Sequence, residues 1–188
     1  LPISTYLTDS LQDSKGIWHE VTLCILPDFL AIGTDTDFLR IPMLPLTAQK
    51  LANLYEATLP TRKLSDLIHH HSLLKLEPHP MTPDSTMTTI PIFARHDSII
   101  ESARQIAGET PGLLIAGHKK DIVITNQMAG EPGRLFIYGW HYPNGQPIQP
   151  LSAAHGIGYV DYSHGVRLIR NEVLVDGQLY SLKALLQD

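Results

Sequence analysis

The stretch LLIAGHKKDIVITNQMAGEPGRLFIYGWH, residues 113–141, decides the fold that the sequence predicts. Apolar runs at 113–116, 122–125 and 134–140 are separated by glycine-rich and charged segments, which is typical of short strands joined by turns. Three segments upstream of this stretch follow a helical period instead. We therefore predict an α+β fold, in which an N-terminal helical half packs on a mostly antiparallel C-terminal β-sheet.

Three helices are expected upstream, over about 48–57, 61–71 and 91–107, because apolar residues recur there at intervals of three and four. Thr47 and Thr61 are the expected N-caps of the first two helices. A threonine hydroxyl can accept a hydrogen bond from a backbone N–H of the first helical turn.

Other segments are expected to form strands or to lack regular structure. Residues 1–15 are polar and predict a loose arm, whereas 17–26 and 29–33 predict two strands. Near the C-terminus, 166–169 and 172–175 predict a hairpin.

The length of 188 residues predicts a single domain, 1–188. Residues 77–91 contain four prolines and four threonines, and proline excludes regular structure at that density. We expect a loop there, separating a helical N-terminal half from a β-rich C-terminal half.

The composition excludes several classes of protein. The formal net charge is −5, and no basic face for nucleic acid is evident. Residues 47–68 resemble a helix-turn-helix, but their charge favours an ordinary helical hairpin. No run of 18 apolar residues predicts a transmembrane segment. The one cysteine, Cys24, lies in an apolar run and predicts a buried thiol, not a disulfide.

Histidines concentrate between residues 118 and 164, beside glycines at the ends of predicted strands. Histidine can donate, accept or bind a metal near neutral pH, so the concentration predicts a functional site. Asp161 could orient a histidine, and Ser163 could act as a nucleophile paired with His141 or His155. A polar network that ties the sheet together is the alternative. The candidate catalytic residues are His118, His141, His155, Asp161, Ser163 and His164.

Aromatic and cationic residues near these histidines predict a substrate-binding wall. Strand alternation places Tyr138 and Trp140 on one face and Gly139 and His141 on the other. Packing of the two aromatic rings in the core is the alternative. Arg167 is a candidate anchor for a carboxylate or an oxyanion. The candidate substrate-binding residues are Tyr138, Trp140, Tyr159, Arg167 and Lys120.

Zinc or another divalent metal is a possible cofactor, with His141, His155 and His164 as candidate ligands. The spacing of these histidines matches no compact zinc signature. Consecutive residues on a helix point about 100° apart, so 69–71, three histidines in a row, cannot converge on one ion. We expect a solvated helix end there.

Several motifs resemble a family of uncharacterised bacterial secreted proteins. The resemblance implies a secreted or periplasmic protein, and a chain that begins at Leu1, not Met, fits a processed mature form. The motifs that carry the resemblance are 37–42, 59–63, 117–121, 138–141, 159–167 and 173–177.

A second, local resemblance lies in the segment SHGVRL, 163–168. It is similar to the Ser-His-Gly-Cys-x-Arg signature of L,D-transpeptidases, which also have an upstream His-Gly pair like 155–156. Here Val166 stands where the signature has its nucleophilic cysteine, and Arg167 comes one residue early. Cysteine-based transpeptidation is therefore not expected.

Together these patterns predict an extracytoplasmic hydrolase with a histidine-rich site, acting on a cell-wall polymer such as a glycan or peptide, or on a small molecule. Histidine with Asp161, or a bound metal, would activate water. The alternative is a non-catalytic module that binds a glycan or peptide. The sequence leaves the oligomeric state open.

Overall fold

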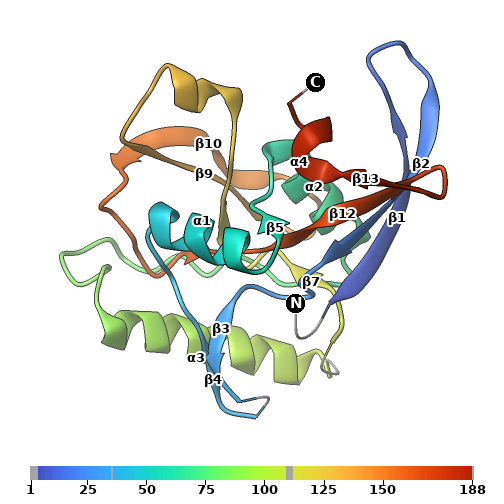
Figure 1. Ribbon diagram of the computed structural model, residues 1–188. Helices are drawn as coiled ribbons and strands as arrows, with labels where there is room; N and C mark the ends of the chain where they lie inside the picture. The colour runs from blue at the N-terminus through green and yellow to red at the C-terminus, as the bar shows by residue number, and fades with distance from the viewer. Residues whose placement is uncertain (1–3, 35, 109–111, 188) are drawn as a thin grey trace.

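The main sheet joins the two ends of the chain (Figure 1). This computed structural model describes residues 4–34, 36–108 and 112–187. The strand order is β1-β2-β12-β13, with β5 also beside β12, and every pair is antiparallel. The strands are β1 (Thr5–Gln12), β2 (Trp18–Ile25), β5 (Ala57–Thr58), β12 (Ile169–Val175) and β13 (Gln178–Ser181).

Two sequence predictions in this sheet are wrong. The expected loose arm at 1–15 contains β1, whose residues alternate between the two faces and bury Leu7. The expected hairpin between 166–169 and 172–175 does not form: Ile169–Val175 is the single strand β12, which hydrogen-bonds to β2 on one side, and 166–168 precede it without strand structure. A register shift in that pairing, between Ile169 and Val173, accounts for the apparent break.

A second sheet has the order β10-β9-β8-β11, in which only the β8–β11 pair is parallel. Two minor two-stranded sheets accompany it, β3 with β4 and β6 with β7. The strands of the second sheet are β8 (Lys120–Ile122), β9 (Arg134–His141), β10 (Pro147–Gly156) and β11 (His164–Gly165). Those of the minor sheets are β3 (Ala31–Gly33), β4 (Phe38–Arg40), β6 (Leu74–Lys75) and β7 (Ile115–Ala116).

The helices confirm the α+β class with mostly antiparallel sheets. Thr61 caps the second helix as predicted, its hydroxyl accepting from the Leu64 N–H, whereas Thr47 lies inside the first helix because Pro45 begins it. Residues 76–89 form neither helix nor strand. The helices are α1 (Pro45–Leu54), α2 (Arg62–His71), α3 (Ile90–Ile106), α4 (Leu182–Leu185) and the 3-10 helix η1 (Asn126–Ala129).

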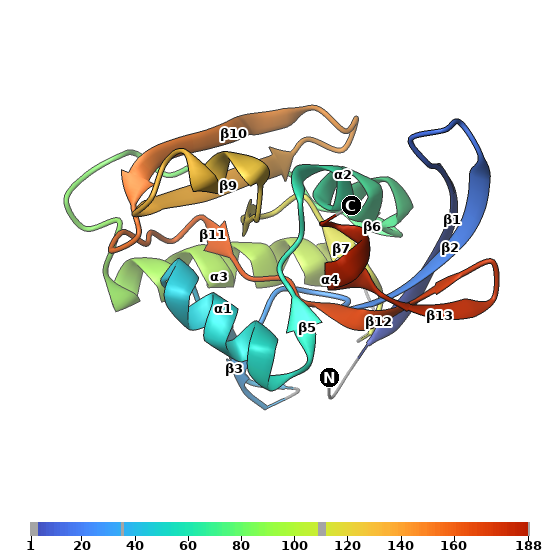
Figure 2. The ribbon, with the colours of Figure 1, turned by 45° about the horizontal axis from the view of Figure 1, so that its top comes forward.

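Helix α2 packs against both sheets, which places its side chains at their junction (Figure 2). Leu64 and Ile68 pack with apolar residues of the main sheet. Ser65 and His69 are also buried, and His69 contacts the end of β9. Asp66 is exposed on α2, between the residues that pack on the main sheet and those that contact β9.

A buried ion network holds β4 against α3. The guanidinium of Arg40 is fully buried and contacts three carboxylates, those of Asp28, Asp97 and Glu101. His118 bonds to the second oxygen of Asp28, with 2.9 Å between Nε2 and Oδ1. The network therefore ties the loop after β2, the β4 strand and the α3 helix to one cation.

Gly117→Ala is expected to destabilise the fold by at least about 2 kcal/mol, because strain and a steric clash combine at this position. Gly117 has φ +100°, and an added Cβ would lie 2.2 Å from the carbonyl oxygen of Leu76 and 2.9 Å from that of His141. Urea denaturation measures the change. Gly108→Ala is the matched control, since its φ is +66° with nothing near the added carbon. Equal losses in both variants would contradict the clash.

Candidate functional site

The four histidines between 118 and 164 do not form one site, because each has a different partner. The contacts are His118 Nε2 with Asp28 Oδ1 at 2.9 Å, His141 Nε2 with Asp66 Oδ1 at 2.9 Å, His164 Nε2 with Asp161 Oδ2 at 3.7 Å, and the His155 ring stacked on that of Tyr159. The single histidine site that the sequence predicts is therefore divided among separate clusters.

The predicted metal site is not assembled. Within the described residues, no group of three or more His, Cys, Asp or Glu side chains could hold a metal ion. His141, His155 and His164 therefore do not form a common ligand set for zinc or another divalent ion. His155 and His164 both contact the ring of Tyr159, whereas His141 is bonded to Asp66 on α2 and lies apart from them.

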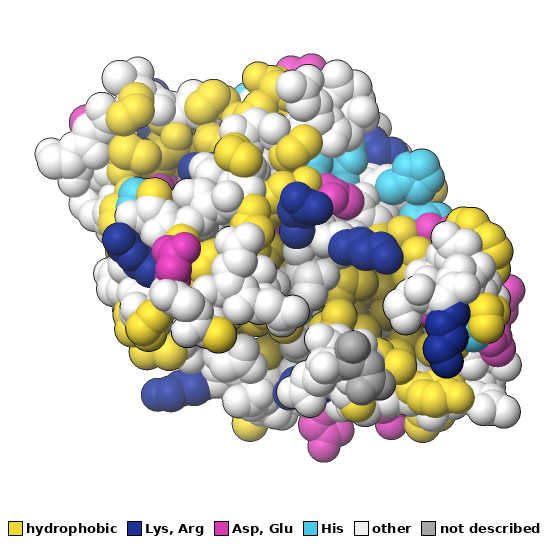
Figure 3. Space-filling view, turned by 90° about the horizontal axis from the view of Figure 1, so that it is seen from above, with side chains coloured by type: hydrophobic (Ala, Val, Ile, Leu, Met, Phe, Trp, Pro, Cys, Tyr) yellow, Lys and Arg dark blue, Asp and Glu magenta, His cyan; other side chains and the backbone are white. Residues whose placement is uncertain are grey.

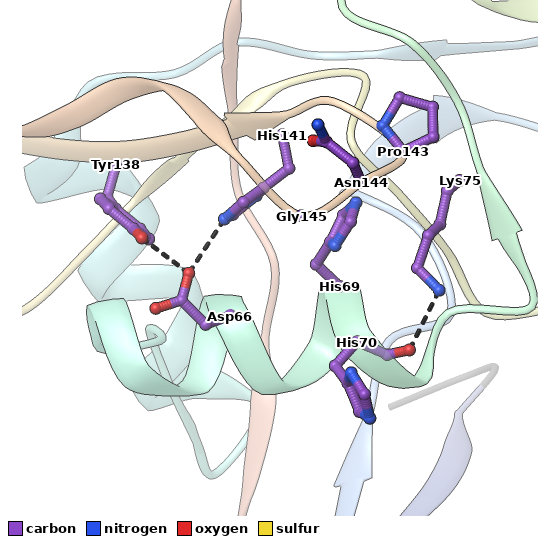
Figure 4. Close-up of a pocket in the computed structure, with 9 residues that line it drawn as sticks. All are labelled: Asp66, His69, His70, Lys75, Tyr138, His141, Pro143, Asn144 and Gly145. Carbon is purple, nitrogen blue, oxygen red and sulfur yellow. Dashed lines mark hydrogen bonds and ion pairs between the residues drawn. The ribbon is translucent and has the colours of Figure 1, made fainter.

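Of these four histidines, His141 lines the cavity shown in Figure 4. The cavity lies between α2 and the turn that joins β9 to β10, and its volume is about 490 Å³. We call it the α2–β9 cleft. Its lining is mostly polar and consists of Asp66, His69, His70, Lys75, Tyr138, His141, Pro143, Asn144 and Gly145.

Asp66 organises the cleft by accepting two hydrogen bonds on one oxygen. Its Oδ1 lies 2.9 Å from His141 Nε2 and 2.7 Å from the donating hydroxyl of Tyr138. The Asp66 side chain is 47% exposed, whereas His141 is buried, so the carboxylate can meet solvent while the imidazole is held in place. Nδ1 of His141 has no protein hydrogen-bond partner in the described part of the chain, and it lies beside Gly139.

A break in strand alternation brings Tyr138 and His141 to the same aspartate. Gly139 and Trp140 both have positive φ, +103° and +55°, which interrupts the two-residue period of β9. Tyr138 and His141 therefore both face Asp66, contrary to the predicted alternation. The missing side chain of Gly139 also leaves room for the His141 ring, since an added Cβ would lie 3.0 Å from its Cε1 atom.

His69 forms the wall of the cleft behind His141. Its ring stacks on the His141 ring, with 4.6 Å between centroids, and it is only 3% exposed. Burial, with the nearby charge of His141, lowers the pKa of His69 to about 4, so it is neutral at pH 7. The predicted solvated helix end is wrong for this residue. The helical stripe that includes Leu64 and Ile68 already points toward the core, and His69 lies beside it.

Asp121 is buried near the cleft. Burial raises the pKa of this carboxyl, against the opposing effect of the buried Arg167 guanidinium. The charge of His141 also acts on Asp121, which places two carboxyl groups, Asp66 and Asp121, near one imidazole.

Asp161 forms a separate, closed cluster. It accepts hydrogen bonds from the Ser163 hydroxyl at 2.6 Å, from the Ser163 N–H at 2.8 Å and from the Tyr159 hydroxyl at 3.1 Å. Ser163 thus pairs with a carboxylate and not with the predicted His141 or His155. Asp161, Ser163 and His164 are all buried. The cluster matches the alternative that the sequence left open, a polar network that ties the sheet together.

His164 gives the cluster a defined pH dependence. Burial lowers its pKa to about 4, despite the opposing charge of Asp161, whereas the unfolded-state value is 6.5. The unfolded chain therefore binds a proton first as the pH falls through 6.5, and folding stability decreases from there toward pH 4. We expect a loss of about 2 kcal/mol between pH 6.5 and 5.0 from this residue alone.

Urea denaturation at pH 7.5 and 5.0 measures this effect. His164→Gln should lose about 2 kcal/mol less than the wild type over that interval. His71, which is partly exposed and paired with Asp9, provides a control substitution, His71→Gln. An unchanged pH dependence in His164→Gln would refute a neutral, buried His164.

Three predicted binding residues have structural contacts instead. Arg167 is 1% exposed and donates to the carbonyl oxygens of Leu26 and Ile115, so it cannot anchor a ligand in this structure. Trp140 is buried, with its ring N–H bonded to the carbonyl of His118, which is the packing alternative. Lys120 lies over the Trp140 ring at 4.9 Å, outside the α2–β9 cleft.

Comparisons of the chain with protein-family models, with curated protein sequences and with solved structures find no match. In the described part of the chain, no helix combines the length and the apolar character needed to cross a membrane.

Proposed function

We propose that this protein is a hydrolase that uses the His141–Asp66 pair as a general base in the α2–β9 cleft. The observation that carries the proposal is an imidazole held by a carboxylate at 2.9 Å on the wall of a cavity of about 490 Å³. A carboxylate that fixes one ring nitrogen sets the tautomer and leaves the other nitrogen basic.

In the proposed reaction, Nδ1 of His141 removes a proton from water while the water oxygen bonds to a substrate carbonyl carbon. Asp66 stabilises the imidazolium that forms, and the Tyr138 hydroxyl fixes the carboxylate in position. The imidazolium then returns the proton to the leaving nitrogen or oxygen as the scissile bond breaks. Neutral His69 keeps the ring of His141 in its plane without adding a competing charge.

The proposed substrate carries a polar group, in keeping with the polar lining of the cleft. A cell-wall peptide has polar groups and a carbonyl carbon at its scissile bond, and it fits the secreted or periplasmic location that the family resemblance implies. Lys75 and Asn144 at the rim provide a cation and an amide for recognition of such a group.

Mass spectrometry of the reaction products tests the proposal. Pure protein is incubated for a day with soluble peptidoglycan fragments and with a set of peptide amides and esters. New termini that incorporate ¹⁸O from labelled water, absent with His141→Asn, are expected. Fragments that bind but stay intact would favour the non-catalytic glycan- or peptide-binding module instead.

A further inference from the structure

We infer that a second cavity, beside the α2–β9 cleft, binds an acyl chain of the substrate. The inference rests on the proposed function for the polar end of that substrate, and it adds that the substrate is an amphiphile. The cavity is a groove of about 500 Å³ over the main sheet, between α2 and α4. We call it the acyl groove.

The acyl groove is built from one face of the main sheet and two helices. Its floor includes Val21 and Val175, which are paired in register on β2 and β12, and its walls include Leu67 of α2 and Leu185 of α4. Ten of its fifteen lining residues are leucine or valine. Seen from above, histidine side chains lie near a hollow that exposes hydrophobic side chains (Figure 3).

The groove and the α2–β9 cleft meet along α2. Asp66 and His70 line both cavities, because they lie one helical turn apart on the exposed ridge of the helix. A ligand with its polar group at His141 can therefore cross the ridge and continue into the groove. The groove has three further polar residues in its lining, which are Asp9, Thr61 and Lys63.

The chemistry of the groove favours an acyl chain over a peptide or glycan. The floor strands β2 and β12 each have a partner on both sides, so their backbone groups are already used in the sheet. Leucine and valine side chains offer no hydrogen bonds either. A peptide or glycan would bury polar groups there without partners, which is unfavourable, whereas an acyl chain has no such groups to satisfy.

The test uses a single-chain fluorescent fatty acid, 11-(dansylamino)undecanoic acid, with the full-length protein. We expect saturable binding, and competition by octanoate, decanoate and dodecanoate that strengthens by about fourfold for each added CH₂. Val175→Trp should fill the groove and weaken probe binding at least tenfold. Leu174→Trp is the matched control, because Leu174 is exposed and does not line the groove. It should bind like the wild type.

Val21→Trp repeats the test from the neighbouring strand, in case Val175→Trp does not fold. If Val175→Trp or Val21→Trp folds and still binds the probe as tightly as the wild type, the inference is overturned. So would a dimer in light scattering that does not bind the probe, since the groove would then be covered by a second copy of the chain. His141→Asn should bind the probe like the wild type, because His141 does not line the groove. A wild-type protein that binds the probe but hydrolyses no substrate would refute the proposed function without refuting the acyl groove.

Discussion

Arg40→Met is expected to lower the free energy of unfolding by about 3–5 kcal/mol, which is a large part of the stability of a typical domain. The guanidinium is 0% exposed and contacts Asp28, Asp97 and Glu101. Its removal would leave these carboxylates close together, with only the Arg104 guanidinium, which pairs with Glu101 at 2.9 Å, as a remaining ion-pair partner among the arginines described. Burial would raise the pKa of Asp28, but Arg40 and His118 outweigh it and hold the pKa well below its usual range. In Arg40→Met the larger of these two stabilising charges is lost.

Urea denaturation with circular dichroism measures this loss at pH 7. Arg170→Met is the matched control, because Arg170 is 43% exposed and pairs with Glu172 at the surface. Exposed pairs contribute little, so the control should change stability by less than about 1 kcal/mol. Similar losses in the two variants would mean that the buried network does not stabilise the fold as argued.

His141→Asn is expected to reduce the rate of hydrolysis by about 10²–10⁴-fold, the usual contribution of a general base. Asparagine cannot take up the proton at neutral pH, although it can still bond to Asp66. Steady-state kinetics on the substrate identified by mass spectrometry measures the loss. A melting temperature near that of the wild type would show that the lost activity is not lost folding.

The control for this prediction is a second histidine–aspartate pair outside the cleft. His19 Nδ1 lies 2.7 Å from Asp176 Oδ2 at the surface, so His19→Asn removes a similar contact without touching the cavity. Its rate should stay within about twofold of the wild type. Full activity in His141→Asn would contradict the proposed role of this residue.

The sequence predicts the elements that depend on local chemistry. Thr61 and the apolar stripe of α2 are neighbours in the chain, so cap and helix were both predictable. The strand β1 was not, because only Leu7 is strongly buried in it and its order comes from pairing with β2. The two strands form a hairpin between 5–12 and 18–25, and the polar first strand of that hairpin shows little apolar pattern of its own.

The candidate site was predictable only in part. Tyr138 and His141 were identified because histidines and aromatic residues are concentrated in that part of the sequence. Asp66 and His69 were missed because their partners lie more than 70 residues away in the chain. Gly139 was the available signal for the break in alternation, since a glycine inside a strand often marks a bulge. The predicted histidine site divides because His118 pairs with Asp28 and His141 with Asp66, whereas His155 and His164 both contact Tyr159.

A double-mutant cycle on hydrolysis tests the central claim most directly. It compares kcat/KM of the wild type, His141→Asn, Asp66→Asn and the double variant on one substrate. If Asp66 acts through His141, the double variant should be about as slow as His141→Asn alone, because residues that act as a unit are not additive. Losses that multiply, or a His141→Asn variant as fast as the wild type, would contradict the account.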